Sequence, residues 1–332
     1  MNMKKVLLLI LVSMMILSGC TAKTNENAAG KETGEKETVT INIPTAATTG
    51  ALYPLGSSIA NLWSNDLDYV KASAQASNGG IDNLNLLQSG EAQVSMAVTS
   101  VMYQSYKGEA TFEGRPNEKL RVISGLYYNP NQVVVKKESN INSLKDIAGK
   151  NFASGAPGST TEVETKLHLT EAGVSYPDGL KVQFVGFTEA IDLMRNKQLD
   201  GAWIMAGLPT AAVTEITTTA DGKLISIDED VITKLQEKNP WYAKYTIPAG
   251  TYDGQEQDIT TTAIKMAIFT TEDLPEDVVY DLTKSFWENI DTLKQSNNAL
   301  KNLKIEDAVT DLAGLPLHDG AIKYYKEVGI LK

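Results

Sequence analysis

The chain contains 332 residues with a formal net charge of −11, one cysteine and two histidines. So acidic a chain is not expected to bind nucleic acid through electrostatic attraction. The single cysteine excludes a disulfide framework, and with only two separated histidines no His/Cys cluster has the spacing of metal ligands. We therefore expect no metal site and no cofactor.

The first twenty residues have the pattern of an export signal. Two lysines precede an apolar run, Val6–Ile16, which is too short to cross a bilayer as a permanent helix. Leu-Ser-Gly and then Cys20 follow this run, and together they resemble a bacterial lipoprotein signal. We predict that residues 1–19 form a signal peptide and that Cys20 carries a lipid, with an unmodified thiol in an ordinary signal peptide as the alternative. Removal of the two lysines brings the net charge from −11 to −13.

The segment after Cys20 contains no large apolar side chain up to residue 38. Such a segment cannot bury surface, so we predict that residues 20–38 form a flexible tether. The folded body then begins near Val39. About 294 residues remain, more than one hydrophobic core usually serves, which favours two lobes.

Strand-like and helix-like segments alternate through the body, which indicates an α/β architecture with largely parallel sheets. The first series is predicted to contain strands at Thr38–Ile43, Asp68–Ala74 and Ala92–Val98, and helices at Pro54–Asn65 and Ile81–Gln88. The second is predicted to contain strands at Asn151–Ala153, Lys181–Val185 and Gly201–Met205, and helices at Thr160–Ala172 and Glu189–Asn196.

The two series resemble each other. Residues 81–98 and 188–205 share a helix, a short polar turn and a strand, and each series opens with a strand, a loop of small residues and a helix N-terminus, at 44–54 and 153–160. Two such lobes facing each other would place two helix N-termini at one cleft. Crevices at the carboxyl ends of strands are where open α/β sheets bind ligands.

Two β-branched runs, Asn131–Lys137 and Thr260–Thr271, are predicted to be a pair of strands that cross between the lobes. Gly250–Gly254 is predicted to be a turn or hinge where the chain returns to the first lobe. Pro275–Ile290 has apolar residues at helical spacing and is predicted to be a packing helix.

The segment from residue 151 to 173 reads NFASGAPGSTTEVETKLHLTEAG. Ser159 and Glu162 have the spacing of a capping box at a helix N-terminus. The small residues 154–158 before them allow a close approach of the backbone to a ligand, and the helix dipole favours negative charge there. Phosphate, an acyl substrate and a carboxylate are the three candidate occupants.

Several chemistries are disfavoured by the residues present. His168 lies nine residues beyond Ser159, about 13 Å along a helix, so a Ser-dependent hydrolase would need His318 as its base. No Gly-Lys-Ser/Thr follows the small-residue loop and no Gly-x-Gly-x-x-Gly follows a strand, which disfavours a nucleotide site. No arginine lies in these loops, so an anion would rest on N–H groups and on the hydroxyls of Thr48, Thr49, Ser154, Ser159 and Thr160.

Ordered motifs along the body show a resemblance to a known family. TTGALYPLGSSIANLW, ASNGGIDNLNLLQSGEAQ, GAPGSTTE, AGLPTAAVTE, TIPAGTYDGQEQD and LPLHDGAIKYYKEVG occur in order between residues 39 and 332. They resemble the TAXI family of TRAP-transporter solute-binding proteins. The resemblance implies a two-lobed, type II periplasmic-binding-protein fold, with lobe 1 at 39–136 and 258–332 and lobe 2 at 137–257.

The resemblance also implies a function without catalysis. Such a receptor binds a small solute in the cleft between its lobes and delivers it, outside the cytoplasm, to a membrane permease driven by an ion gradient. Family members with known ligands tend to bind glutamate, glutamine or related small carboxylates. A sensor that passes the closed state to a signalling protein is the alternative that the motifs leave open.

Carried onto this sequence, the resemblance places residues of five loops and strand ends in the pocket. These residues are Thr48, Thr49, Tyr53, Asn78, Gly79, Ser100, Ser154, Ala156, Ser159, Thr160, Trp203, Met205 and Pro209. The chain departs from the family where relatives have Tyr-Tyr-Pro, which is Leu52-Tyr53-Pro54 here, and where an acid is expected, which is Val101. Loss of that acid would weaken recognition of an ammonium group, so the ligand need not be an amino acid.

Overall fold

The computed structural model describes residues 36–239 and 241–332. The predicted signal peptide, the lipid-modified Cys20 and most of the predicted tether lie outside these residues. Residues 37–332 form one compact unit. Within the described part of the chain, no helix is both long and apolar enough to span a membrane.

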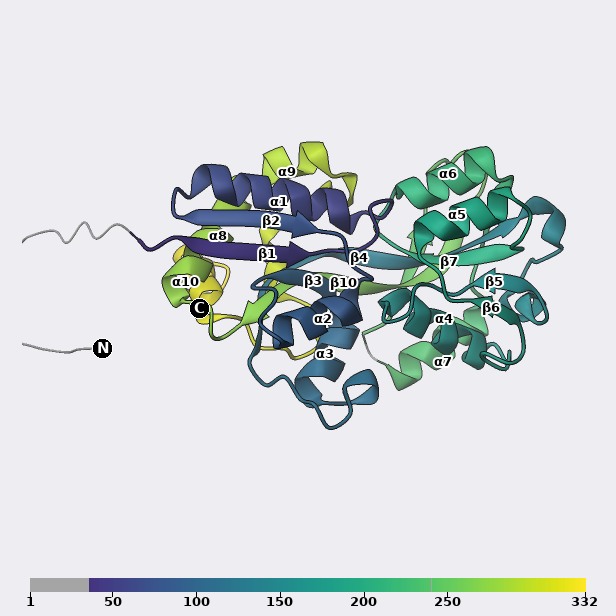
Figure 1. Ribbon diagram of the computed structural model, residues 1–332, viewed down its shortest axis with the longest axis horizontal. Coiled ribbons are helices and arrows are strands. Elements are labelled where there is room, and N and C mark those ends of the chain that lie inside the picture. Colours follow the sequence, from purple (N-terminus) through teal and green to yellow (C-terminus); the bar gives the residue numbers. More distant parts are fainter. Residues whose placement is uncertain (1–35, 240) are drawn as a thin grey trace, which may run out of the picture. The chain divides into compact units, whose positions relative to one another are not determined.

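Strands and helices alternate from the start of the described chain (Figure 1). The strands are β1 (Val39–Pro44), β2 (Val70–Gln75), β3 (Ser95–Val98), β4 (Leu120–Lys136), β5 (Asn151–Ala153), β6 (Lys181–Gln183), β7 (Gly201–Met205), β8 (Gly222–Ile225), β9 (Ala243–Ile247) and β10 (Ile259–Thr271). The α-helices are α1 (Leu52–Asp66), α2 (Gly80–Gln88), α3 (Thr99–Lys107), α4 (Thr160–Glu171), α5 (Phe187–Arg195), α6 (Ala211–Thr219), α7 (Glu229–Lys238), α8 (Glu276–Glu288), α9 (Ile290–Ser296) and α10 (Asp319–Glu327). Short 3-10 helices lie at Ala110–Phe112, Lys137–Ser139, Leu144–Ile147, Asn298–Leu300 and Ile305–Val309.

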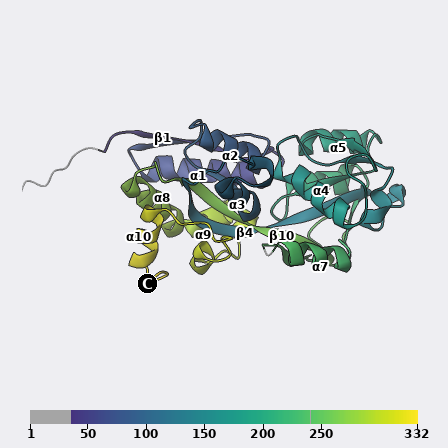
Figure 2. The same ribbon diagram turned by 90° about the horizontal axis from the view of Figure 1, so that it is seen from below.

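The two longest strands, β4 and β10, run through the whole unit, as the two perpendicular views show (Figures 1 and 2). The large sheet has the order β3-β10-β4-β7-β5-β6, with β8 paired to β4 and β9 paired to β10. The elements β1–β3, α1–α3 and α8–α10 lie towards one end of these strands, and we name them the terminal group. The elements β5–β9 and α4–α7 lie towards the other end and are named the middle group.

The middle group has a core on both faces of its sheet, because successive residues of a strand point to opposite faces. Val133 and Trp203 pack on the face that α4 and α7 cover. Val134, Ala202 and Ile204 belong to a second hydrophobic cluster on the opposite face, together with residues of α5 and α6. This face-by-face burial explains why Val133–Val135 of β4 and residues 201–205 of β7 have no alternation of apolar and polar residues.

The α/β alternation predicted from the sequence is confirmed, and the predicted strands and helices begin and end within three residues of the observed ones, except for the start of β4. The prediction of largely parallel sheets is wrong. Only β1–β2, β5–β6 and β5–β7 pair in parallel, whereas β10 and β4 pair antiparallel with each other and with every other neighbour. The reason is the path of the chain, which leaves the terminal group along β4 and returns along β10.

The predicted pairing of the two crossing strands needs a correction. β10 pairs with the earlier part of β4, from Leu120 to Pro130, which the sequence did not identify as a strand. The predicted segment pairs instead with β7 from Asn131 to Val135 and with β8 from Val133 to Lys136. The predicted turn at Gly250–Gly254 is confirmed as part of the loop between the antiparallel strands β9 and β10. Its role as a hinge and the predicted lobe boundaries remain predictions.

Half of the predicted capping box forms. The Ser159 hydroxyl accepts a hydrogen bond from the Glu162 N–H at 3.2 Å, as a helix N-cap does. The Glu162 carboxylate does not return to the Ser159 N–H, which donates instead to the Ala156 carbonyl. The Glu162 carboxylate instead accepts a hydrogen bond from the Tyr176 hydroxyl at 2.9 Å. A tertiary contact therefore replaces the local capping contact.

A buried polar network joins the two long strands to α4 and β7. Asn131 of β4 donates to the Thr262 hydroxyl of β10 at 3.0 Å and accepts from the Trp203 indole at 2.8 Å. His168 of α4 lies 2.7 Å from the same Thr262 hydroxyl through Nε2, and 2.7 Å from the Glu164 carbonyl through Nδ1. The carbonyl can only accept, so Nδ1 carries the proton and Nε2 accepts.

Two titratable groups of opposite type share this network. The Glu164 carboxylate accepts hydrogen bonds from the Tyr242 hydroxyl at 2.9 Å and from the Asn131 amide at 3.3 Å. Burial raises the pKa of Glu164 to about 7, although these two hydrogen bonds oppose the rise. Burial lowers the pKa of His168 to about 4. Both side chains are therefore most stable uncharged.

These pKa changes predict opposite pH dependences for two variants. Between about pH 4.5 and 7 the folded state keeps a proton on Glu164 that the unfolded chain has released, so this group weakens folding as the pH rises. Between about pH 4 and 6.5 the unfolded chain holds a proton that folded His168 lacks, so this group weakens folding as the pH falls. As the pH rises, the unfolding free energy of Glu164→Gln should increase relative to that of the unsubstituted protein. The unfolding free energy of His168→Gln should decrease relative to it. Each slope is at most about 1.4 kcal/mol per pH unit.

Urea unfolding at half-unit steps from pH 4 to 7.5 measures both slopes. If the two variants keep the pH profile of the unsubstituted protein, the proton placement in this network is wrong.

Candidate ligand-binding site

A cavity of about 120 Å³ lies between the terminal group and the middle group. Loops that follow the carboxyl ends of β1, β2, β5 and β6 form much of its wall, which is the usual position of a ligand in an open α/β sheet. The lining residues are Ala46, Ala47, Gly50, Ala51, Leu52, Ser77, Asn78, Gly79, Gly80, Ala97, Val98, Asn129, Ala156, Ser159, Thr160, Thr161, Gly186, Phe187, Met205, Ala206 and Met266. This volume is room for several water molecules or one small solute.

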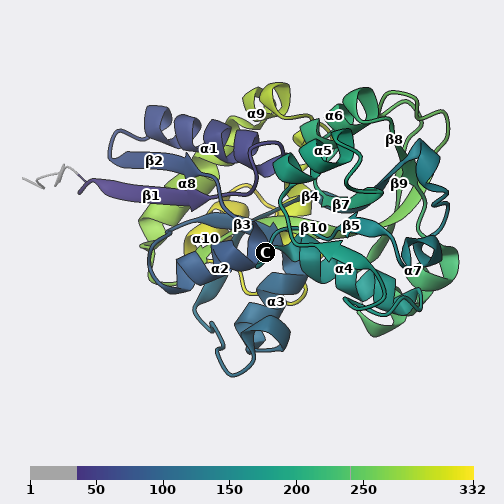
Figure 3. The same cartoon turned by 45° about the vertical axis from the view of Figure 1, so that its right-hand side comes forward.

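Four helices begin at this cavity. The residue before each helix and its first residue line the wall, at Ala51-Leu52 for α1, Gly79-Gly80 for α2, Ser159-Thr160 for α4 and Gly186-Phe187 for α5. Two of these helices belong to each group of elements, and Figure 3 shows them on both sides of the central strands. The first N–H groups of a helix have no partner within the helix, and each N-terminus carries about half a positive charge.

The two groups touch each other around the cavity. The Asp82 N–H of α2 donates to the Gly158 carbonyl at 3.2 Å, and the Ala212 N–H donates to the Thr49 carbonyl at 3.1 Å. A Cβ atom placed on Gly50 would lie 3.6 Å from the Phe187 ring. The structure therefore has the cavity closed between its two walls.

Two buried polar side chains in the wall lack protein partners. The Thr160 hydroxyl and the Asn129 Oδ1 atom have no hydrogen-bond partner among the described residues. A buried polar atom without a partner costs about 1 to 3 kcal/mol, so each is a natural contact for a bound molecule. The Asn129 amide can present either its oxygen or its NH₂ group to such a molecule.

No charged side chain belongs to this wall among the residues that the structure describes. Glu189 lies in the first turn of α5, and the acids Asp82 and Glu162 lie in the first turns of α2 and α4. The Asp82 and Glu162 carboxylates are held by the Asn78 N–H at 3.1 Å and by the Tyr176 hydroxyl. The polarity of the cavity thus comes from backbone groups, hydroxyls and an amide.

A fully buried asparagine holds the loops of the terminal group in place. The Asn83 amide donates to the Thr45 carbonyl at 2.7 Å and to the Met96 carbonyl at 3.0 Å. Its oxygen accepts from the Ser77 hydroxyl at 2.6 Å, which in turn accepts from the Gly79 N–H. One side chain thereby fixes the loop after β1, the end of β3 and the N-terminus of α2.

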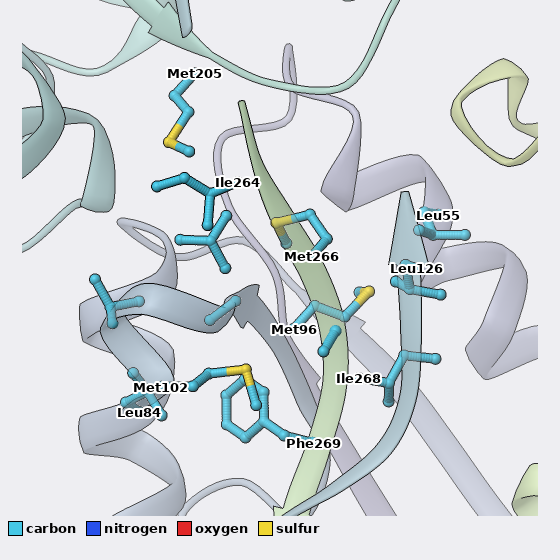
Figure 4. Close-up of a cluster of buried hydrophobic side chains, with 14 of the residues drawn as sticks. Leu55, Leu84, Met96, Met102, Leu126, Met205, Ile264, Met266, Ile268 and Phe269 are labelled. Carbon is cyan, nitrogen blue, oxygen red and sulfur yellow. The ribbon is translucent and has the colours of Figure 1, made fainter. Parts of the chain in front are cut away.

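Sulfur-containing side chains form the apolar floor. Met205 of β7 and Met266 of β10 line the cavity, and they lie beside Ile264 in the buried cluster (Figure 4). Methionine is flexible and polarizable, so such a floor adapts to the shape of an apolar group.

Six of the residues predicted from the sequence come together in this wall. They are Asn78, Gly79, Ala156, Ser159, Thr160 and Met205. All except Met205 lie in small-residue loops or at helix N-termini, where the sequence pattern was strongest.

The other predicted residues lie near the cavity or in the core, outside its wall. Thr48 and Thr49 lie in the loop after β1, and the Thr49 hydroxyl is 3.4 Å from the Thr188 hydroxyl. Tyr53 is the second residue of α1. Pro209 lines a separate surface hollow with Tyr127 and Lys301.

The remaining three predicted residues are buried. Ser100 lies in α3, and Ser154 lies beneath the N-terminus of α4, where its carbonyl accepts from the Thr165 hydroxyl. Trp203 is a core residue of the polar network, with its indole N–H bonded to Asn131 and its ring tilted by 52° against that of His168. Their contact with a ligand remains a prediction.

Several wall residues were not predicted. Phe187 and Gly186 follow β6 at the start of α5, and the sequence placed that helix two residues later. Asn129 lies in the part of β4 that was not recognised as a strand. The first residues of α5 had a detectable signal, because the repeat of strand, loop and helix implies an N-terminus there too.

Neither histidine is available as a catalytic base. Both ring nitrogens of His168 have partners in the buried network, and the ring is fully buried. His318 is the N-cap of α10, with Nδ1 accepting the Gly320 N–H at 3.1 Å. The Ser159 hydroxyl is occupied as an N-cap, so this arrangement does not assemble a Ser–His pair.

Comparison with known proteins agrees with this architecture. Residues 43–329 match the model of a family described as the NMT1-like family. A structure from Bordetella bronchiseptica RB50 is similar over 88% of this chain and 89% of that chain, with 15% identity and a TM-score of 0.51. A structure from a study of glutathione import by GshT and the cystine ABC importer TcyBC of Streptococcus mutans matches over 86% and 99%, with 16% identity and a TM-score of 0.50.

A third similar structure is the alkanesulfonate-binding protein SsuA from Xanthomonas axonopodis pv. citri bound to MOPS. It covers 89% of this chain and 92% of its own, with 14% identity and a TM-score of 0.47. At such identities structural similarity establishes the fold alone. The fold is the mixed α/β fold of periplasmic solute-binding proteins.

We predict that Asn83→Ala lowers the unfolding free energy by about 3 kcal/mol. The reason is that the buried Thr45 and Met96 carbonyls would no longer accept hydrogen bonds from the Asn83 amide. Asn85→Ala is the matched control, since Asn85 lies in the same helix and its Oδ1 atom has no partner. Urea unfolding of both variants measures the difference. Equal losses in the two variants would show that Asn83 is not the fixing residue.

Proposed function

The chain belongs to the NMT1-like family, and from this premise we propose that it is an extracytoplasmic solute receptor without catalytic activity. It binds a small carboxylate, such as glutamate, glutamine or another organic acid, in the closed cavity. It then delivers this solute to a TRAP-type membrane permease, while a lipid on Cys20 keeps the receptor at the membrane.

The convergence of four helix N-termini on one closed cavity is the observation that carries this proposal. Unpaired N–H groups and the positive ends of helix dipoles bind anions. The hydroxyls of Ser159 and Thr160 add donors at the α4 end. A carboxylate is small enough to enter such a cavity and needs no arginine when several N–H groups face it.

The choice of a TRAP-type permease rests on the ordered motifs of residues 39–332, which resemble the TAXI receptors. Such receptors serve permeases driven by ion gradients, whereas the similar Streptococcus mutans structure comes from a study of an ABC importer. Uptake of the solute should therefore stop when the ion gradient across the membrane is collapsed.

In this proposal, closing of the two cavity walls links solute binding to delivery of the solute to the permease. Each wall of the cavity supplies helix N-termini, so a solute that touches both walls favours the closed state by its differential affinity. The permease then recognises the closed surface.

We predict that the chain from Thr21 onward retains a small carboxylate through purification. Native mass spectrometry compared with the denatured mass should show the added mass of this solute. Added back at a hundredfold excess over its dissociation constant, the solute should raise the unfolding free energy by about 2.7 kcal/mol. An empty protein that shows no thermal shift with any small carboxylate would contradict the proposed function.

The contact between the two walls predicts a second effect. A Cβ atom on Gly80 would lie 2.5 Å from the Thr160 hydroxyl and 3.2 Å from the Ala97 methyl group. Gly80→Ala should therefore keep α2 and α4 apart and lower solute affinity about tenfold, measured by isothermal titration.

Gly186→Ala is the control for this variant. It adds the same methyl group to the cavity wall, at a residue with an extended backbone and no atom within 4 Å. If Gly80→Ala and Gly186→Ala weaken solute binding equally, the cause is the smaller cavity and not a failure of the two walls to close.

A further inference from the structure

We infer that the solute is a short monocarboxylate with an uncharged, apolar body and without an ammonium group. This inference rests on the proposed function, because it specifies the class of solute that the same cavity takes. It follows from the different chemistry of the two ends of the cavity.

One end of the cavity suits a carboxylate. The N-termini of α2 and α4 meet there, and Thr160 Oγ1 lies 2.5 Å from the position that a Cβ on Gly80 would take. The Thr160 hydroxyl is buried, lines the cavity and has no hydrogen-bond partner among the described residues. It can therefore donate to a carboxylate that also faces the free N–H groups of both helices.

The other end suits an apolar group. The helices that begin there, α1 and α5, place Leu52 and Phe187 in the wall, and neither has a side chain that can bond to an anion. Met205 and Met266 add further apolar surface to the cavity. A second carboxylate at this end would have only the backbone N–H groups of α1 and α5, without the hydroxyl donors of the other end, and would lose part of its hydration to the apolar side chains.

An ammonium group has no acidic partner in the wall. None of the described lining residues is acidic, and the Asp82 and Glu162 carboxylates already accept hydrogen bonds from the Asn78 N–H and the Tyr176 hydroxyl. The positive ends of four helices also repel a cation. An amino acid would therefore bury an uncompensated positive charge.

The wall adds one more selective contact. The Asn129 amide is buried in the wall, and its Oδ1 atom has no partner. Its NH₂ group can be turned towards an oxygen of the solute, such as the keto oxygen of a 2-oxo acid. The cavity of about 120 Å³ has room for roughly ten non-hydrogen atoms of solute.

A panel of matched solutes tests this inference on the mature chain after any retained solute has been removed by unfolding and refolding. The four solutes are 4-methyl-2-oxopentanoate, L-leucine, 2-oxoglutarate and L-glutamate, which vary the ammonium group and the second carboxylate separately. Isothermal titration should show that 4-methyl-2-oxopentanoate binds at least tenfold more tightly than each of the others. Thr160→Ala should weaken its binding about tenfold, and Thr160→Ser should restore most of it.

The outcomes separate this inference from the proposed function. If leucine, glutamate or 2-oxoglutarate binds as tightly or more tightly, the inference is wrong, while the receptor for small carboxylates stands. If none of the four binds, to a refolded chain that has regained its native unfolding temperature, both are wrong.

Discussion

The structure depends on one constraint, which is that two strands must carry the chain out of the terminal group and back again. β4 and β10 therefore run antiparallel through the whole unit, and their central residues are buried between helices of both groups. The polar atoms of these strands must find partners there, because an unpaired polar group in the interior is costly. The network of Asn131, Thr262, His168 and Glu164 meets this need and fixes α4 against the strands.

Fixing α4 also fixes the cavity. Glu164 and His168 lie in α4, five and nine residues beyond its N-cap Ser159, so the N-terminus of α4 points to the same place whenever the network is intact. Asn83 does the same for α2 from the terminal group. The donors of the cavity are then positioned by side chains that do not themselves line it, and little conformational entropy remains to be lost when an anion binds.

Much of this arrangement could be predicted from local patterns. The capping serine at 159 and the Asn-Gly-Gly turn at 78–80 indicate helix N-termini after small-residue loops, and both reach the cavity. The pairing of β4 could not be predicted, because its first part has polar residues such as Asn129 and its partners lie more than 130 residues away. The resemblance to TAXI receptors placed Trp203 and Ser154 in the pocket, yet the depth of a side chain is set by tertiary packing, and both are buried. Phe187 was missed because the sequence predicted the start of α5 two residues late.

A cavity without charged side chains also has a consequence for release. An arginine side chain would keep its charge near the solute after the two walls separate. Helix N-termini on opposite walls contact the anion jointly only while the walls are closed. In the proposed receptor, separating α2 from α4 removes about half of the donors at once. Affinity then falls steeply with opening, and the solute is retained in the closed state and released in the open one without any titrating group or ion in the wall.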